Sequence, residues 1–206
     1  MRVESIRTLS GPNVYSHRPV LLMRLDLEGL YEKESYEVEG FVERLLALMP
    51  SLREHHCSKG YAGGFVERLE EGTYFGHIVE HVTLELAAMA GCKATHGKTR
   101  YAGEPGLYNV VIEFCAEHAT RYLLGRAVAL VEAAIKGEEF PLASWSDACR
   151  WCARLCSRIM RAKHSWHIRF VAFAAPRRIK CPHQAHTTSV LLASLCSPAS
   201  LIVDDS

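Results

Sequence analysis

The chain lacks any long hydrophobic run. Although 49% of its 206 residues are hydrophobic, no uninterrupted apolar stretch approaches the roughly 20 residues of a membrane-spanning helix. Residues 1–7, with the sequence MRVESIR, also lack the apolar core of a secretion signal. These absences indicate a cytoplasmic protein with no membrane partner. The eight Cys are therefore expected as reduced thiols rather than as a disulfide framework.

Glycine and tryptophan are each missing from one part of the chain. All 14 Gly lie at or before Gly137, whereas all three Trp lie after it. Residues 1–142 hold 15 Lys/Arg and 20 Asp/Glu, a formal balance of −5, and residues 143–206 hold 9 and 3, a balance of +6. This seam predicts a domain over residues 1–142 and an atypical tail, rich in Cys, Arg and Ser, over residues 143–206.

Hydrophobic periodicity predicts strands and helices in the first segment. Strands are expected over residues 1–10, 19–27, 95–102 and 107–115, with the first two antiparallel. Helices are expected over residues 39–48, 65–70, 73–90 and 118–136, with Thr73 as the N-cap of the third. This order predicts the α+β class, in which helices pack on a mainly antiparallel sheet.

The most informative pattern is the sequence GHIVEH at residues 76–81. On a helix, His77 and His81 lie one turn apart and point the same way, with Glu80 beside them. Two such imidazoles can bind one Zn²⁺ ion, and the carboxylate can deprotonate a zinc-bound water. H-x-x-E-H is the inverted zinc-hydrolase signature, so His77 and His81 are predicted metal ligands and Glu80 the general base. The alternative is a solvated helix face with no metal.

A hydrolytic zinc ion needs a third protein ligand and one open position. Glu113 is the first candidate, because an acidic residue inside the apolar stretch 108–114 requires an explanation. The alternative explanation is a strand-edge carboxylate that pairs with Arg or Lys. Glu85, one turn after His81, and Glu117 are weaker candidates for the third ligand.

Residues 1–142 resemble the N-terminal domain of cyanophycin synthetase in many separate phrases that occur in the same order. The strongest phrases are GTYFGHIVEHV at residues 72–82 and GEPGLYNVV at residues 103–111. Shorter ones are LSGPN at residues 9–13, RPV at 18–20, EHHCSKG at 54–60 and GGF at 63–65. The resemblance covers about two thirds of the chain.

The resemblance implies a domain that holds cyanophycin, a poly-Asp chain with Arg on each side-chain carboxylate. Members that keep H-x-x-E-H resemble zinc peptidases at this site, which implies cleavage of the polymer into primers. The full enzyme joins Asp and Arg at the expense of ATP, with an ATP-grasp and a Mur-ligase-like domain. This chain has neither a Gly-rich ATP-binding loop nor a Mur-type P-loop, so no ATP site and no synthetase activity are expected. Full-length members are homo-oligomers, which keeps self-association open.

Four further residues are candidates for substrate contact. His55 and His56 lie in a polar, Gly-rich stretch and are candidates to contact the polymer or the metal. Arg100 is a candidate to pair with carboxylates of the polymer, and Glu104 with its guanidinium groups. The −5 balance suits a partner decorated with Arg, although it is also typical of an ordinary acidic surface.

Three functions therefore stand as hypotheses: a zinc-dependent hydrolase of cyanophycin, a non-catalytic polymer-binding module, and an inactive truncation product. The tail resembles no continuation of the family, and our leading explanation is an out-of-frame continuation. A metal module at Cys149, Cys152 and Cys156 is a weaker explanation. The basic residues form no recognisable nucleic-acid-binding motif, so a nucleic-acid partner is not expected. We expect an irregular tail with a helix over residues 146–163.

Overall fold

Four strands form one antiparallel sheet in the order β1-β2-β4-β3. The structure is a computed structural model that describes residues 1–92 and 96–141. The strands are β1 (Arg2–Leu9), β2 (Val20–Asp26), β3 (Gly97–Tyr101) and β4 (Leu107–Glu113). Each lies within a range that the apolar pattern predicts, and the first two pair antiparallel as expected.

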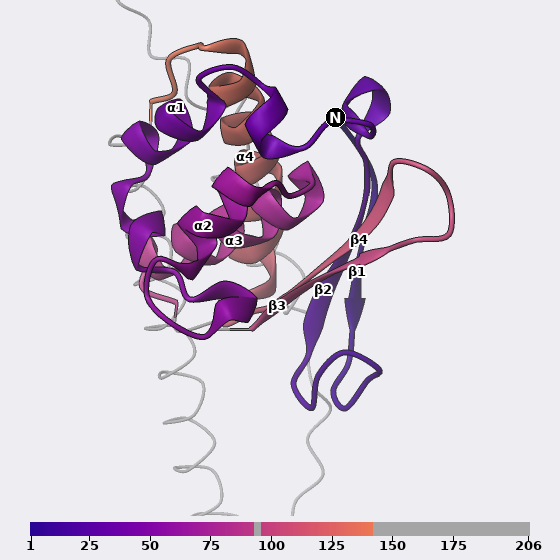
Figure 1. The fold of residues 1–206 in the computed structure, drawn as a ribbon. Coiled ribbons are helices and arrows are strands. Elements are labelled where there is room, and N and C mark those ends of the chain that lie inside the picture. Colours follow the sequence, from indigo (N-terminus) through magenta and orange to yellow (C-terminus); the bar gives the residue numbers. More distant parts are fainter. Residues whose placement is uncertain (93–95, 142–206) are drawn as a thin grey trace, which may run out of the picture. The chain divides into compact units, whose positions relative to one another are not determined.

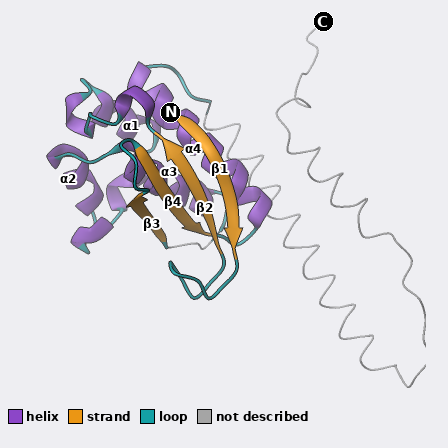
Figure 2. Ribbon diagram, turned by 90° about the vertical axis from the view of Figure 1, so that its right-hand side faces the viewer, coloured by secondary structure: helices purple, strands orange, loops and turns teal. Residues whose placement is uncertain are grey.

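Helices cover one side of this sheet (Figures 1 and 2). The described part contains α1 (Phe41–Leu48), α2 (Gly64–Glu71), α3 (Phe75–Met89) and α4 (Glu117–Lys136). Short 3-10 helices lie between β2 and α2: η1 (Glu28–Leu30), η2 (Ser35–Glu37), η3 (Pro50–Glu54) and η4 (Cys57–Lys59). The predicted α+β class is confirmed, and the helices pack on an antiparallel sheet.

The alternation of side chains along each strand decides which residues face the helices. Met23 of β2 and Val110 and Ile112 of β4 face the helices and belong to the main hydrophobic core. Val111 lies on the opposite face, in a small separate cluster with residues of β2. The same alternation decides which strand side chains can reach the functional site.

Helix α3 occupies the centre of the core and packs between α4 and the strands β3 and β4. Gly76 lets it approach the sheet closely, because a Cβ atom there would lie 3.1 Å from Cγ of Tyr108. The predicted N-cap was wrong by one residue: Tyr74 occupies that position and makes no side-chain capping bond. The Thr73 hydroxyl bonds to the ring of His77 instead.

Cys92 and Cys115 form a disulfide. The expectation of reduced thiols was therefore wrong for this pair. The physical reason is tertiary: Cys92 follows α3 and Cys115 follows β4, and these two elements pack against each other. Among the described residues, the free thiol belongs to Cys57.

Within the described ranges, no helix has both the length and the apolar character needed to cross a membrane. The cytoplasmic location stays a prediction. The predictions for the tail, which include the boundary at residue 142, the Cys149 to Cys156 module and the helix over residues 146–163, lie outside the described residues.

Replacing Phe75 by Ala is expected to lower the free energy of unfolding by about 3–5 kcal/mol. Phe75 is fully buried, and its ring meets that of Phe41 edge-on with the centroids 5.3 Å apart. Urea denaturation measures the change. Val14→Ala is the control, because Val14 is 88% exposed and its truncation should change stability by less than about 0.5 kcal/mol. Equal losses in the two variants would contradict this assignment of the core.

Candidate metal centre

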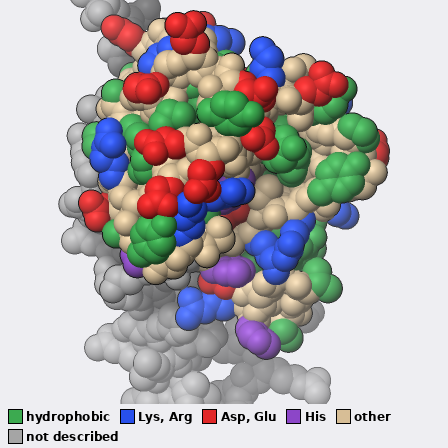
Figure 3. All heavy atoms as spheres, in the orientation of Figure 1, with side chains coloured by type: hydrophobic (Ala, Val, Ile, Leu, Met, Phe, Trp, Pro, Cys, Tyr) green, Lys and Arg blue, Asp and Glu red, His purple; other side chains and the backbone are tan. Residues whose placement is uncertain are grey.

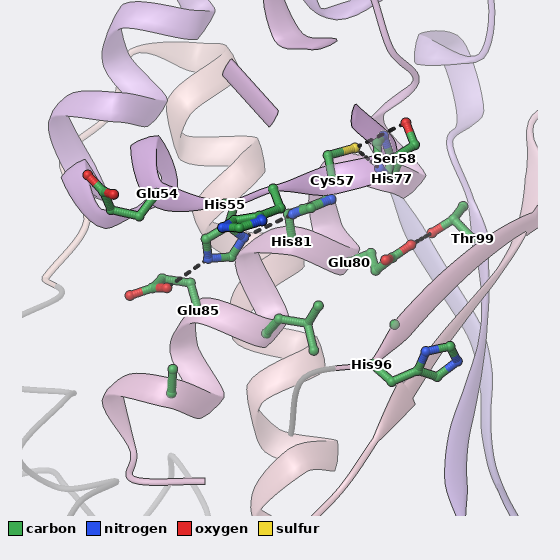
Figure 4. Close-up of a pocket in the computed structure, with 14 residues that line it drawn as sticks. Glu54, His55, Cys57, Ser58, His77, Glu80, His81, Glu85, His96 and Thr99 are labelled. Atoms are coloured by element: carbon green, nitrogen blue, oxygen red, sulfur yellow. Dashed lines mark hydrogen bonds and ion pairs between the residues drawn. The ribbon is translucent and has the colours of Figure 1, made fainter. Parts of the chain in front are cut away.

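A pocket of about 680 Å³ lies between α3, the segment that contains η3 and η4, and the start of β3 (Figure 4). Its polar lining includes three of the residues that the helical motif predicts to be functional, His77, Glu80 and His81. The fold therefore brings the two predicted metal ligands and the predicted general base to one cavity.

Cys57, His77 and His81 converge at one end of this pocket. The Sγ atom of Cys57 lies 3.4 Å from Nε2 of His77, and one ligand atom from each of the three residues lies within 4.8 Å of the others. A tetrahedral zinc ion separates its sulfur and nitrogen ligands by about 3.4–3.6 Å, and Cys with two His is a donor set that zinc accepts. Cys57 and His77 already lie at the spacing of two zinc ligands, and a nitrogen of His81 lies near enough to complete the set.

The loop that carries Cys57 is held by close backbone packing. Gly64, at the start of α2, lies directly beneath it, because a Cβ atom there would stand 2.3 Å from the carbonyl oxygen of His56. Cys57 itself has a φ of 55°, in the left-handed region that residues other than glycine rarely adopt. The Gly-rich stretch after Cys57 thus has a structural role in placing the thiol.

Burial keeps both imidazoles neutral. It lowers the pKa of His77 to about 4, with a smaller contribution from the positive charge of Arg68. It lowers the pKa of His81 to about 2, assisted by the neighbouring His77 and His55. The ring of Phe65 stacks on that of His81 with centroids 4.0 Å apart. At neutral pH each ring therefore keeps a lone pair for a metal ion.

Glu80 is also taken out of water. Burial raises its pKa to about 7, against the opposing effect of a 2.7 Å hydrogen bond that the Thr99 hydroxyl donates to Oε2. Strand β3 closes over the carboxylate at Gly97, where a Cβ atom would lie 2.8 Å from Oε1. A carboxylate with a pKa near neutrality is well matched to general base catalysis.

The Nδ1 atoms of the two imidazoles have hydrogen-bond partners. Thr73 Oγ1 lies 2.8 Å from Nδ1 of His77, and Nδ1 of His55 lies 2.9 Å from Nδ1 of His81. The other ring nitrogen of His55 lies 2.9 Å from Oε2 of Glu85. This hydrogen bond is the main reason why the pKa of Glu85 is lowered.

The structure does not bring Glu113 to this pocket. Because side chains alternate along β4, the neighbouring core residue Ile112 faces the helices and Glu113 faces the other way. There the Ser16 hydroxyl donates to its carboxylate, and Nη1 of Arg18 lies 3.8 Å away. The alternative explanation, a strand-edge carboxylate paired with Arg, describes its contacts.

The other two candidates for the third ligand have different surroundings. Glu117 accepts hydrogen bonds from the hydroxyl of Thr8 and the guanidinium of Arg121, and it is not among the described residues that line the pocket. Glu85 does line the pocket, but its carboxylate contacts His55.

Of the four predicted substrate contacts, His55 and His56 line the pocket, and His56 Nδ1 lies 3.3 Å from the carbonyl oxygen of Gly60. Arg100 and Glu104 are absent from the described part of its lining. Arg100 follows Thr99 on β3 and points to the opposite face of the sheet, and Glu104 lies in an exposed turn, 3.9 Å from Arg24.

Cys57 is the functional candidate that the sequence pattern missed. Its signal was present in the phrase EHHCSKG, which contributed to the family resemblance, but a lone Cys in a loop has no periodic relation to a helical motif. The packing of η4 against α2, and of the preceding η3 against α2 and α3, places the thiol beside His77.

Charges on the helical face are interleaved rather than separated. Figure 3 shows acidic side chains spread over this face among Lys and Arg, with histidines toward its lower part. Lys59, for example, pairs with Glu67 at 2.8 Å and also with Glu71. Acidic residues on this face are thus paired in part with basic neighbours and do not gather into one acidic patch.

Comparison with known proteins gives matches confined to the first part of the chain. A family model described as "Cyanophycin synthase-like N-terminal domain" matches residues 22–136. Cyanophycin synthetase of Crocosphaera subtropica is 46% identical over 144 residues, and that of Trichormus variabilis is 48% identical over 145 residues. Each alignment covers 69% of this chain and 16% of the relative. The chain thus spans only a small part of the length of these synthetases.

Replacing Thr99 by Val is expected to lower the free energy of unfolding by about 1–3 kcal/mol at neutral pH. The substitution keeps the shape of the side chain but removes the donor to the buried Glu80 carboxylate. Chemical denaturation in the presence of a chelator measures the loss. Thr99→Ser retains the hydroxyl and should lose clearly less. If the Ser variant were the less stable of the two, the hydrogen bond would not be the cause.

Proposed function

The chain belongs to the cyanophycin synthase-like N-terminal domain family, and we propose that its described domain is a zinc-dependent hydrolase that binds an Asp/Arg polymer and cleaves its amide bonds. The observation that supports this proposal best is the convergence of Cys57, His77 and His81 beside the buried carboxylate of Glu80. Synthesis of the polymer is not proposed for this chain.

The metal part of the proposal assigns three ligands. Sγ of Cys57, Nε2 of His77 and the Nε2 atom of His81 would hold the ion, since Nδ1 of each His already contacts a protein partner. Three protein ligands leave one coordination position open. When bound, zinc would lower the pKa of a coordinated water and polarise the carbonyl of the scissile amide.

Glu80 would transfer the proton. Its Oε2 atom is engaged by Thr99, so Oε1 is the atom that accepts the proton as the water oxygen attacks the amide carbon. The C–O bond forms first. The C–N bond then breaks, and Glu80 returns the proton to the leaving nitrogen. The water is thereby divided between the new carboxyl and amino ends.

The pocket also suits a substrate that carries guanidinium groups. Glu54 and Glu85 line it beside the three ligands, and carboxylates accept two parallel hydrogen bonds from an Arg side chain. Arg100 and Glu104, on other parts of the molecule, are not assigned to the cleavage step.

The first test is a measurement of metal content. Under reducing conditions we expect the full chain to bind about one zinc ion at this centre, and Cys57→Ser to lose most of it on dialysis, because a hydroxyl is a poorer ligand for zinc than a thiolate. Ser58→Ala is the neighbouring control and should keep the ion. A variant with Cys149, Cys152 and Cys156 all replaced by Ser distinguishes zinc bound by the tail from zinc bound at this centre, because only the tail-bound zinc should be lost. Full zinc content in Cys57→Ser would remove Cys57 from the site.

The second test is cleavage of cyanophycin by the zinc-loaded chain. Glu80→Gln keeps the size of the side chain but cannot accept the proton, so kcat should fall by at least about 100-fold while zinc and polymer binding persist. Chain length of the polymer on gels measures the reaction. Glu70→Gln, an exposed change on α2, should leave the rate unaltered.

Two results would overturn the hydrolase proposal. If the zinc-loaded wild-type chain bound the polymer without shortening it, the domain would be a non-catalytic binding module. If it neither bound nor shortened the polymer, the substrate assignment would be wrong as well.

A further inference from the structure

Two side chains extend the metal centre on the far side of His81. His55, just after η3, lies with Nδ1 2.9 Å from Nδ1 of His81. Its other ring nitrogen, Nε2, lies 2.9 Å from Oε2 of Glu85, one helical turn after His81 on α3 (Figure 4). The three side chains form one continuous row that begins at a carboxylate and ends at a proposed ligand.

The hydrogen-bonding capacity of this row fixes where each proton lies. A metal ion on Nε2 of His81 requires a proton on Nδ1, which then donates to Nδ1 of His55. His55 then carries its own proton on Nε2, and this N–H donates a hydrogen bond to the carboxylate of Glu85. With His55 neutral, each contact then has one donor and one acceptor, and the row holds His81 in the tautomer that a metal ion needs.

The same contacts argue that His55 is not itself a ligand. Two nitrogens bound to one tetrahedral zinc ion are about 3.3 Å apart, whereas the two Nδ1 atoms lie at 2.9 Å, an ordinary hydrogen-bond distance. His55 also meets the nitrogen of His81 that is turned away from Cys57 and His77 (Figure 4).

We infer that His55 and Glu85 are positioning residues, which hold His81 in the tautomer and ring orientation that bind the metal ion. This inference rests on the proposed zinc centre and adds to it a support that neither the motif nor the family comparison assigns. Imidazole ligands whose second nitrogen donates to a carboxylate-backed partner bind metal more tightly than unsupported ones.

The surroundings make this support rigid. The side chains of His55 and Glu85 are only 18% and 13% exposed. Phe65 stacks on the ring of His81, and the ring of His55 lies 6.1 Å from it between centroids. His77 has a comparable support in the Thr73 hydroxyl at its own Nδ1. Both proposed imidazole ligands thus have a hydrogen-bond partner at Nδ1, the nitrogen that does not bind the metal.

The test is zinc affinity of the full chain, measured under reducing conditions by competition with a chromophoric chelator. His55→Ala should weaken binding by about 10–100-fold, the usual effect of losing such a partner. His55→Asn should recover part of the loss, because its side-chain oxygen can accept a hydrogen bond from Nδ1 of His81. His56→Ala is the matched control on the adjacent residue of the same pocket and should leave the affinity unchanged.

Glu85→Gln tests the other end of the row, with Glu54→Gln as its control in the pocket. We expect a smaller loss than for His55→Ala, since the amide oxygen still accepts a hydrogen bond from His55 but carries no charge. The double variant His55→Ala/Glu85→Gln should bind zinc no more weakly than His55→Ala alone, because the row is already broken at His55. Additive losses would contradict a continuous row.

Thermal unfolding of each zinc-free variant separates positioning from a merely structural role. A structural role lowers the zinc-free melting temperature and leaves zinc affinity intact, and that result would overturn the inference while the proposed function stands. If the wild-type chain binds no zinc, both fall together. Should His55→Ala fail to fold, His55→Asn and Glu85→Gln provide the comparison, and unchanged affinity in both would reject the inference.

Discussion

The close approach of α3 to the sheet is the constraint on which the chemistry of this domain depends. A Cβ atom at Gly97 would lie 2.7 Å from Cγ of Glu80, so that something would have to shift, and one at Gly76 would lie 3.1 Å from Cγ of Tyr108, a tight contact. Because α3 is packed this closely, its polar side chains are separated from water. Desolvation is the largest cause of the shifts that bring the pKa of Glu80 to about 7 and that of His77 to about 4.

Three elements supply this site, and each depends on a different feature of the sequence. Helix α3 presents its residues through the helical repeat, and β3 supplies Thr99 through strand alternation. The η3–η4 segment contributes His55 and Cys57, and it is held in place where α2 packs beneath it at Gly64. The Gly-rich stretch is therefore part of the scaffold of the centre and not only a flexible connection.

The sequence allowed the elements, the antiparallel pairing and the shared face of His77 and His81 to be predicted, because those follow from local periodicity. Cys57 and the contact between His55 and His81 could not be predicted, since they join segments that meet only in the folded chain. Glu113 was the first candidate for the third ligand, but strand alternation argues against it: Ile112 faces the helices, so the side chain of Glu113 faces away from them.

Metal binding and folding are expected to be linked in this domain through the same side chains. A ligand that binds the folded chain and not the unfolded one stabilises the fold by mass action, and zinc ligands must be deprotonated before they bind. The desolvated imidazoles of His77 and His81 already satisfy this condition at neutral pH. The desolvation cost of burying these two imidazoles is therefore part of the folding free energy of the zinc-free chain, and not of metal binding. For this reason, the stability of the zinc-free chain and its zinc affinity have to be compared variant by variant.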